Sequence, residues 1–271
     1  MTIAIEKARV ATLGCVWVRH TNVFTMASNY STMALEHDCV GLAACNGVPL
    51  VAPWGGRDPV FNTSPLSFAI PAGNERPIVF DGSVSSVSHG QVVLAARDGV
   101  RLAAKYLVDQ QGRFTDDARR LVVDAYDRNS EVRGSILPLG HKGFAGLILM
   151  EVLTGILAGM STSRTIPVEQ SAEHPWSGGL CLAAIDVGKL VPIDQFKAKV
   201  DELIRDIKRS RLARGFREIL VPGHRAMREA ERRRREGVPV REEDWRYVGG
   251  VARELGLDVE RLRADCGARE S

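Results

Sequence analysis

The 271-residue chain lacks most of the motifs by which enzymes are recognised from sequence alone. It contains no G-x-G-x-x-G, so a Rossmann dinucleotide site has no support, and no G-x-S-x-G, which argues against a serine hydrolase. It also has neither H-E-x-x-H nor a C-x-x-C pair, so we do not expect a zinc site. These absences leave the chain without a standard cofactor, hydrolase or metal signature.

The chain also has few cysteines and a small net charge. The chain has five scattered cysteines, Cys15, Cys39, Cys45, Cys181 and Cys266. We therefore do not expect a disulfide framework, and a reducing cytoplasm is the simpler interpretation. The net charge of +3 is too small to indicate a nucleic-acid or membrane partner. The arginines at 232–235 follow Glu229 and Glu231 at helical spacing, which favours a salt-bridged solvent face over a nucleic-acid patch.

No hydrophobic run is long enough to span a bilayer. The most apolar stretch, from Phe144 to Met160, is interrupted by Glu151 and by glycines, and it falls short of the roughly 20 residues required. We therefore expect a buried core helix in a soluble protein. The first eight residues have the pattern of an amphipathic helix rather than of a signal peptide.

Apolar runs and helical patterns alternate along the chain, which is typical of an α/β fold. Short apolar runs predict strands near residues 15–18, 40–45, 66–70, 77–80, 180–186 and 219–221. Helical patterns cover 26–37, 90–104, 142–160 and 193–214. We expect an α/β body over residues 1–225, followed by a charged helical segment over 226–271 that packs on it.

Three segments have residue types suited to an anionic ligand. In the first, a predicted strand ends at Asp81 and a helix follows after the residues Gly82, Ser83, Val84, Ser85, Ser86 and Val87. Because most of these side chains are small, backbone N–H groups can approach a negatively charged ligand. A plain strand–helix turn with a serine cap explains the same residues equally well.

The second and third segments each combine glycine with basic residues. His141 and Lys142 precede the apolar helix, where a lysine can supply a point charge to a phosphate, although an exposed loop lysine is the commoner case. Gly223, His224 and Arg225 follow the last predicted strand, and a turn with a solvated arginine is the alternative there.

Four segments, in this order and separation, resemble the malate/L-lactate dehydrogenase family, which includes ureidoglycolate and sulfolactate dehydrogenases and 2,3-diketogulonate reductase. They are residues 48–65 (VPLVAPWGGRDPVFNTSP), 81–90 (DGSVSSVSHG), 137–143 (LPLGHKG) and 218–223 (EILVPG). The resemblance extends over essentially the whole chain. It implies the family's own α/β fold, in which a non-Rossmann cofactor-binding sheet is flanked by helices.

The resemblance also implies an activity and a set of site residues. It implies NAD or NADP as cofactor, a homodimer, and hydride transfer between the nicotinamide and a small 2-oxo or 2-hydroxy acid. By motif, the cofactor would be lined by Asp81 to Val87, by His141 with Lys142, and by Gly223 with His224 and Arg225. These are the same three segments that the residue chemistry indicates.

The sequence departs from the family where proton transfer is concerned. The family's turn of the type Asn-Ser-Asn-His-Phe-Gly reads His20-Thr21-Asn22-Val23-Phe24-Thr25 here, and valine cannot exchange a proton. His20 lies nearby and could substitute as the catalytic residue after a local shift, although a histidine exposed in a surface turn is the commoner case. The family's N-terminal helical region, with its catalytic His and substrate-binding Arg, has no counterpart in this sequence. A catalytically silent or split-enzyme cofactor-binding paralogue is therefore the alternative to an active dehydrogenase.

Overall fold

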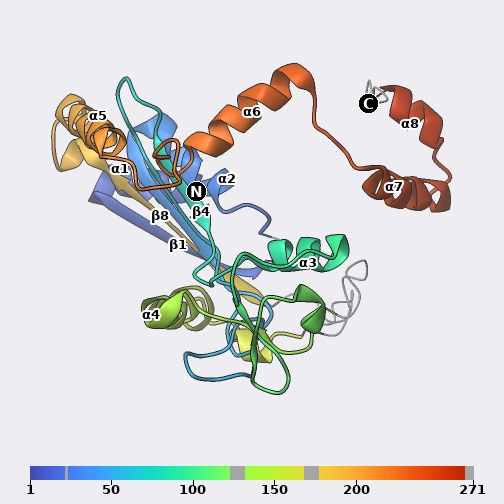
Figure 1. The fold of residues 1–271 in the computed structure, drawn as a ribbon. Coiled ribbons are helices and arrows are strands. Elements are labelled where there is room, and N and C mark those ends of the chain that lie inside the picture. The colour runs from blue at the N-terminus through green and yellow to red at the C-terminus, as the bar shows by residue number, and fades with distance from the viewer. Residues whose placement is uncertain (22–23, 123–131, 168–176, 266–271) are drawn as a thin grey trace. The chain divides into compact units, whose positions relative to one another are not determined.

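The computed structural model describes residues 1–21, 24–122, 132–167 and 177–265 (Figure 1). The chain divides into two compact units, Met1–His224 and Arg225–Ser271. The first unit contains two antiparallel sheets with helices around them, and the second contains three charged helices. In the described ranges, no helix is both long and apolar enough to cross a membrane.

The larger sheet has five strands in the order β1-β8-β2-β3-β4, and every neighbouring pair is antiparallel. The strands are β1 (Leu13–Thr21), β8 (Gly178–Asp186), β2 (Cys39–Cys45), β3 (Leu66–Ile70) and β4 (Ile78–Gly82). It follows from this pairing that β1, β2 and β4 run in one direction and end at the same end of the sheet. The segments that follow these three strands are thereby gathered on one side.

One face of this sheet is covered by α1 (Thr2–Ala11), α2 (Ser28–Ser31) and the 3-10 helix η1 (Thr32–His37) (Figure 1). The buried side of α1 packs against β2 and β8 through Ile5 and Ala8. The approach of α1 to β1 requires a glycine at position 14, because a Cβ there would lie 2.0 Å from the Ala4 carbonyl oxygen. This face is therefore closely packed.

Among the described elements, helices cover the opposite face at its two ends. At one end, Ile204 of α5 (Ile193–Arg209) packs against Ile78. At the other end, α4 (Gly140–Glu151) continues into the π-helix η3 (Val152–Ile156), which meets β8 at Gly179. A Cβ at residue 179 would lie 2.0 Å from the Thr154 carbonyl oxygen, so this contact also depends on glycine.

A second, smaller sheet lies beside α4, in the order β6-β5-β7. Its elements and their neighbours are β5 (Leu107–Val108), β6 (Phe114–Thr115), β7 (Ser135–Ile136), α3 (His89–Asp98) and the 3-10 helix η2 (Ala118–Arg120). Its core includes the fully buried side chains of Val51, Val92, Leu107, Leu121 and Leu147. Since Leu147 belongs to α4, this helix joins the small sheet to the large one.

The remaining elements are short 3-10 turns and the helices of the second unit: η4 (Ser163–Thr165), η5 (Val187–Lys189), α6 (His224–Glu236), α7 (Glu242–Glu254) and α8 (Val259–Asp265). In α6, Arg232 pairs with Glu229 at 2.7 Å and with Glu236 at 2.9 Å. Arg233 also pairs with Glu229, at 2.7 Å. These ion pairs match the salt-bridged solvent face expected for this segment.

Three expectations require correction. The strand over 219–221 does not form, because Pro222 has no N–H to donate and Gly223 turns the chain at φ 89°. Instead of a strand pairing there is a single hydrogen bond, from the Val79 N–H to the Pro222 carbonyl at 3.1 Å. Two helices are shorter than predicted: the one over 90–104 ends at Asp98, since Gly99 adopts a left-handed cap, and the one over 193–214 ends at Arg209.

The third correction concerns the apolar helix over 142–160, which was expected to be buried. Only one side of α4 is buried, through Gly143, Leu147, Met150 and Glu151. On the other side Leu149 is 53% exposed, and Ile156 and Leu157 just beyond are exposed to a similar degree. Burial within the described chain therefore does not account for the apolar composition of residues 142–160.

Candidate functional site

The first predicted segment begins where β4 ends. The Val84 N–H donates to the Thr63 carbonyl at 3.0 Å, which fixes the segment to the loop that precedes β3. The Ser85 hydroxyl donates to the Val87 carbonyl at 2.7 Å. Ser88 then caps α3 by accepting the Gln91 N–H, so the serine-capped turn considered from the sequence is present. Residues 83–87 are thus held in a defined backbone conformation.

The first and second predicted segments lie together. The Ser86 N–H donates to the Leu137 carbonyl at 2.9 Å, and the Leu139 N–H donates to the Val84 carbonyl at 3.1 Å. The Ser86 hydroxyl donates to the Pro138 carbonyl at 2.6 Å. Residues separated by about fifty positions therefore form one short two-stranded contact immediately before α4.

The start of α4 is open. Leu139 at the N-cap provides no side-chain hydrogen bond, and His141 and Lys142 in the first turn are exposed. Gly140 has φ 63°, and no atom lies within 4 Å of the position that a Cβ would take. Unpaired helix N–H groups carry partial positive charge, to which the Lys142 ammonium adds. The His141 and Trp54 rings pack edge-to-face with their centroids 6.2 Å apart, which places an aromatic wall beside this positive end.

Asp81 has a structural partner. Its carboxylate accepts the Ser28 N–H at 2.7 Å, at the start of α2. Burial raises the pKa of the neighbouring Cys45 thiol to about 12, and the charge of Asp81 adds to the effect. Cys45 is therefore a neutral thiol at physiological pH and not a nucleophile. Asp81 connects the end of β4 to the helix layer on the covered face.

The third predicted segment lies at the other end of β4. A Cβ on Gly223 would come within 2.7 Å of the Val79 carbonyl oxygen, and the His224 ring nitrogen Nε2 lies 3.2 Å from the Arg76 carbonyl oxygen. His224 is only 2% exposed. Burial lowers the pKa of His224, and its bond to the Arg76 carbonyl opposes this in part. Arg225 belongs to the second unit.

His20 lies at the end of β1 where the register with β8 shifts, and it is exposed with φ 52°. It lies at the same end of the sheet as residues 83–87, but β1 and β4 are the two edge strands. Four strand spacings of about 4.8 Å separate them by roughly 19 Å. Val23, at the position of the family histidine, lies outside the described residues.

A buried polar network at this end of the sheet was not foreseen. The Glu151 carboxylate accepts the Ser163 N–H at 2.5 Å and the Ser163 hydroxyl at 2.7 Å. The Asn46 side chain donates to the Ser161 carbonyl at 2.9 Å and accepts the Gly179 N–H at 2.9 Å. A single glutamate inside an apolar run was the available signal. The network connects the end of β2, the start of β8 and the turn after η3.

The described residues contain no group of three or more His, Cys, Asp or Glu that could hold a metal ion. What the site does combine is an open helix start, a lysine, an aromatic wall and a rigid backbone at one end of a sheet. Such a combination is suited to a phosphate-containing ligand with a flat ring system.

Known proteins resemble the chain over most of its length. It is 34% identical over 261 residues to the L-sulfolactate dehydrogenase of Methanothermobacter thermautotrophicus, covering 96% of this chain and 72% of that protein. It is 31% identical over 245 residues to the Δ1-pyrroline-2-carboxylate/Δ1-piperideine-2-carboxylate reductase of Pseudomonas putida, covering 89% and 67%.

Among solved structures, the sulfolactate dehydrogenase of Methanocaldococcus jannaschii superposes with a TM-score of 0.82 at 30% identity, covering 96% of this chain and 72% of that one. The malate dehydrogenase of Pyrococcus horikoshii superposes with a TM-score of 0.79 at 25% identity, covering 95% and 69%. A family model described as malate/L-lactate dehydrogenase matches residues 1–248. The fold and motifs agree with this match: the chain belongs to the malate/L-lactate dehydrogenase family.

Proposed function

We propose that the chain binds NAD or NADP and transfers hydride between the nicotinamide and a small 2-oxo or 2-hydroxy acid. Membership of a family of oxidoreductases that act on such acids supports the reaction class. The observation that carries the cofactor proposal is the contact of residues 83–87 with 137–139, directly beside the open start of α4.

The residues at this contact fit the diphosphate part of such a cofactor. The Gly140 N–H donates to the Pro138 carbonyl, so the N–H groups of His141 and Lys142 and the Lys142 ammonium would bind the phosphate oxygens, and the open space beside Gly140 would admit them. The Ser86–Pro138 hydrogen bond holds the two backbone segments at a fixed separation. The rings of Trp54 and His141 pack edge-to-face beside this space and offer an aromatic surface to a flat ring. When bound, the nicotinamide supplies or accepts the hydride.

The relatives' names support the substrate class, and the position of His20 supports a location for the substrate. Relatives are named for sulfolactate, malate and Δ1-pyrroline-2-carboxylate, which are all small carboxylates. We place the substrate at the same end of the sheet, with His20 as the proton donor to the oxo group. His20 lies across the sheet from the phosphate-binding residues, so a cofactor extended along this end lies between them.

Calorimetric titration of the whole chain with NADH and with NADPH tests the cofactor proposal. Lys142→Ala removes the ammonium beside the helix start and should weaken binding about tenfold, which corresponds to one charge-assisted contact. Lys199→Ala, an exposed lysine on α5, is the matched control and should bind as the unmodified chain does. A folded chain that binds neither nucleotide would contradict the proposal.

Turnover separates the active enzyme from the catalytically silent alternative. The chain is incubated with NADH or NADPH and a panel of small 2-oxo acids, and loss of absorbance at the nicotinamide band is followed. His20→Ala should abolish turnover and leave nucleotide affinity unchanged. Nucleotide binding without turnover of any acid would favour the silent or split-enzyme paralogue, and turnover that survives His20→Ala would remove His20 from the reaction.

A further inference from the structure

β1 ends in a bulge that carries two adjacent basic residues. The register of β1 with β8 shifts after Val18. Arg19 and His20 then lie opposite Gly179 alone, since pairing resumes at Thr21. Two residues against one form a β-bulge, which interrupts the regular alternation of side chains and is often found beside active sites. His20 adopts a left-handed φ of 52°, which departs from the extended conformation of the strand. The bulge therefore lies at the end of the sheet where we place the substrate.

The Arg19 guanidinium lies flat against the backbone that follows η3. A Cβ on Gly159 would lie 3.6 Å from the Arg19 Cζ and 3.7 Å from each of its two terminal nitrogens. Three nearly equal distances place that point above the plane of the guanidinium and not at its edge. Gly159 has φ 67°, so both its backbone conformation and this contact favour glycine. The contact leaves the edge of the guanidinium, where its N–H groups point, clear of Gly159.

The N–H groups along this edge are unused. Within the described residues, the Arg19 side chain has no ion pair and donates no hydrogen bond. A basic side chain beside a helix C-terminus often bonds to the last carbonyls, but Arg19 forms no such bond in the described chain. The edge of a guanidinium matches a carboxylate through two parallel N–H···O bonds. The Arg19 edge is therefore suited to an external carboxylate.

The backbone under Arg19 is fixed by hydrogen bonds. The Gly159 N–H donates to the Ile156 carbonyl at 2.9 Å. A few residues further on, the Ser163 hydroxyl donates to the buried Glu151 carboxylate at 2.7 Å, which ties the segment after η3 back to α4. A surface that is already ordered reduces the entropy lost when a ligand binds. The Arg19 guanidinium is thus supported before any ligand arrives.

We propose that Arg19 binds the carboxylate of the 2-oxo or 2-hydroxy acid, beside His20. This inference rests on the proposed function, because it assigns a substrate contact at the same site. In a 2-oxo acid the carboxylate is bonded directly to the oxo carbon, so the groups that bind the carboxylate and protonate the oxo oxygen must be neighbours. Arg19 and His20 are adjacent in the bulge and meet this requirement. In the reduction, hydride goes to the oxo carbon and a proton from His20 goes to the oxo oxygen, which gives the 2-hydroxy acid.

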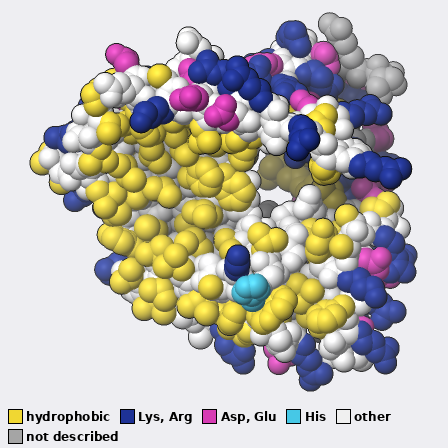
Figure 2. Space-filling model, turned by 60° about the vertical axis from the view of Figure 1, so that its left-hand side comes forward, with side chains coloured by type: hydrophobic (Ala, Val, Ile, Leu, Met, Phe, Trp, Pro, Cys, Tyr) yellow, Lys and Arg dark blue, Asp and Glu magenta, His cyan; other side chains and the backbone are white. Residues whose placement is uncertain are grey.

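Apolar side chains precede the contact with Arg19 in the chain. Ile156 is 55% exposed and Leu157 is 56% exposed, just before Gly159. Figure 2 shows hydrophobic side chains gathered over much of one face of the molecule. An ion pair is stronger beside apolar groups than in open water, because the effective dielectric constant is lower there. The contact between Arg19 and a carboxylate should therefore contribute strongly to substrate affinity.

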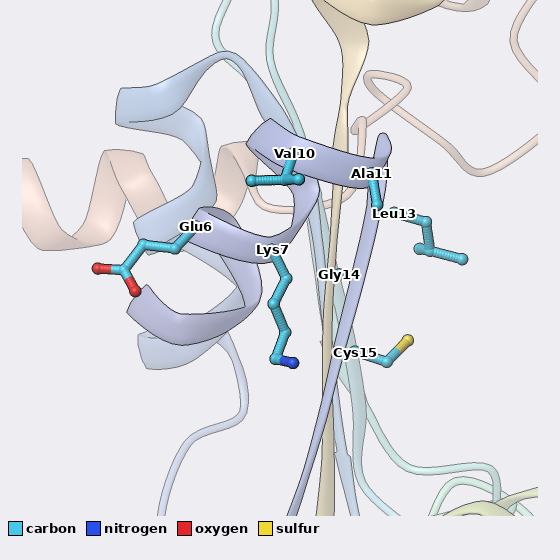
Figure 3. Close-up of a pocket in the computed structure, with 7 residues that line it drawn as sticks. All are labelled: Glu6, Lys7, Val10, Ala11, Leu13, Gly14 and Cys15. Carbon is cyan, nitrogen blue, oxygen red and sulfur yellow. The ribbon is translucent and has the colours of Figure 1, made fainter.

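A second exposed lysine or arginine near β1 provides a matched control. Figure 3 shows Lys7 beside a groove of about 530 Å³ between α1 and the start of β1. Leu13, at the start of the strand, is six residues from Arg19, which corresponds to about 20 Å along β1. Lys7 is exposed, as Arg19 is, but it lies at the opposite end of the strand from His20. A general effect of losing one positive charge would appear at both positions.

Steady-state kinetics of the whole chain, with NADH or NADPH, test the assignment. Arg19→Ala should lower kcat/KM for a 2-oxo acid about a hundredfold, because two charge-assisted hydrogen bonds are lost. Arg19→Lys keeps the charge but not the paired N–H groups, so its kcat/KM should lie about tenfold below that of the unmodified chain. The methyl ester of the same acid has no charge, so its turnover should be nearly equal with and without Arg19. Lys7→Ala should change none of these values.

Binding of oxamate, in which an amide replaces the reducible oxo group, separates this inference from the proposed function. Calorimetric titration of the whole chain with oxamate, with and without NADH, should show binding that Arg19→Ala weakens about a hundredfold. Circular dichroism confirms that the variant is folded. An equal loss of kcat/KM for the acid and its ester in Arg19→Ala would overturn the assignment. So would oxamate binding that does not depend on Arg19, or no oxamate binding by the folded chain. Oxamate binding through Arg19 without turnover of any acid would support the assignment and contradict the proposed reaction.

Discussion

The Ser86 hydroxyl donates a hydrogen bond of 2.6 Å to the Pro138 carbonyl, and this bond joins two segments that are about fifty residues apart in sequence. The adjacent backbone bond from the Ser86 N–H to the Leu137 carbonyl reinforces it. Together they fix the turn after β4 against the start of α4. Any ligand that contacts both segments depends on this spacing.

Ser86→Ala should therefore reduce both stability and nucleotide binding. The loss of one hydroxyl donor costs about 1 kcal/mol in the free energy of unfolding, because the backbone bond remains. We expect NADH affinity to fall severalfold, because the spacing of the two segments is less tightly fixed without the hydroxyl bond. Urea denaturation and calorimetric titration measure the two effects. Ser210→Ala, at an exposed position after α5, should change neither. Unaltered NADH affinity in Ser86→Ala would show that the spacing is not used by the cofactor.

Asp201 secures the β3–β4 hairpin to α5. Its buried carboxylate accepts backbone N–H groups from Gly73 at 2.9 Å, Asn74 at 2.7 Å and Glu75 at 3.2 Å. Asp201→Ala leaves these donors without a partner and should lower the free energy of unfolding by about 3 kcal/mol. Thermal or urea unfolding gives the value. The exposed Asp206→Ala on the same helix is the control, and equal losses in both variants would contradict the role of the hairpin bonds.

The Asp201 carboxylate should also make the free energy of unfolding depend on pH. Burial alone would raise the pKa of Asp201, but the three N–H bonds and Arg205 outweigh burial and the pKa is lowered. A lowered native pKa means that the stabilisation is complete above the unfolded value of about 3.9 and is lost as pH falls through the native pKa. Urea midpoints measured from pH 6 downward should fall less steeply below pH 4 in Asp201→Ala than in the unmodified chain.

His224 should make the free energy of unfolding depend on pH in a higher range than Asp201 does. Burial lowers its pKa, so the folded chain binds this proton less readily than the unfolded chain does. Stability is then greatest above the unfolded value of about 6.5 and decreases as pH falls below it. Urea midpoints between pH 7.5 and 5 should show this loss, and His224→Gln should reduce it. His89, whose pKa is also lowered by burial, accounts for a separate part.

Gly179→Ala should separate η3 from β8. The added methyl group would lie 2.0 Å from the Thr154 carbonyl oxygen and 2.9 Å from the Ala158 side chain, so backbone has to move. We expect a loss of about 3 kcal/mol in the free energy of unfolding. Gly90→Ala is the matched control, because its Cβ would meet nothing within 4 Å and alanine favours α3. A similar melting temperature for the two variants would contradict the close packing described.

Local chemistry predicted the residue types of the candidate site but not their arrangement. A lysine between glycines before an apolar helix indicates an anion site, and Lys142 is exposed at the start of α4. The hydrogen bonds from Val84 and Ser86 to residues 137–139 depend on long-range pairing that no local pattern encodes. His224 shows the same limit, since its burial beside Arg76 follows from the path of the chain along β4.

The secondary structure was predictable where an apolar run coincides with a buried strand, and not where proline or glycine sets the backbone conformation. Apolar runs indicated β2 and β8 because both are central strands with buried residues on both faces. At 219–221 a similar run gave no strand, because Pro222 and Gly223 prevent a ladder. Hydrophobicity also could not reveal that α4 leaves Leu149 exposed, since an apolar residue has the same sequence signal in a core and at an interface.

The position of β8 determines when the large sheet can form. β1 and β2 are close in sequence, yet they do not pair with each other, because β8 lies between them and is the partner of both. On the ribosome, about 165 residues must be added after Thr21 before β8 is complete, which takes roughly ten to thirty seconds at ordinary rates of synthesis. During that interval the nascent β1 is an apolar strand without its β8 partner. We expect folding of this chain to be slow and dependent on chaperones that bind extended apolar segments.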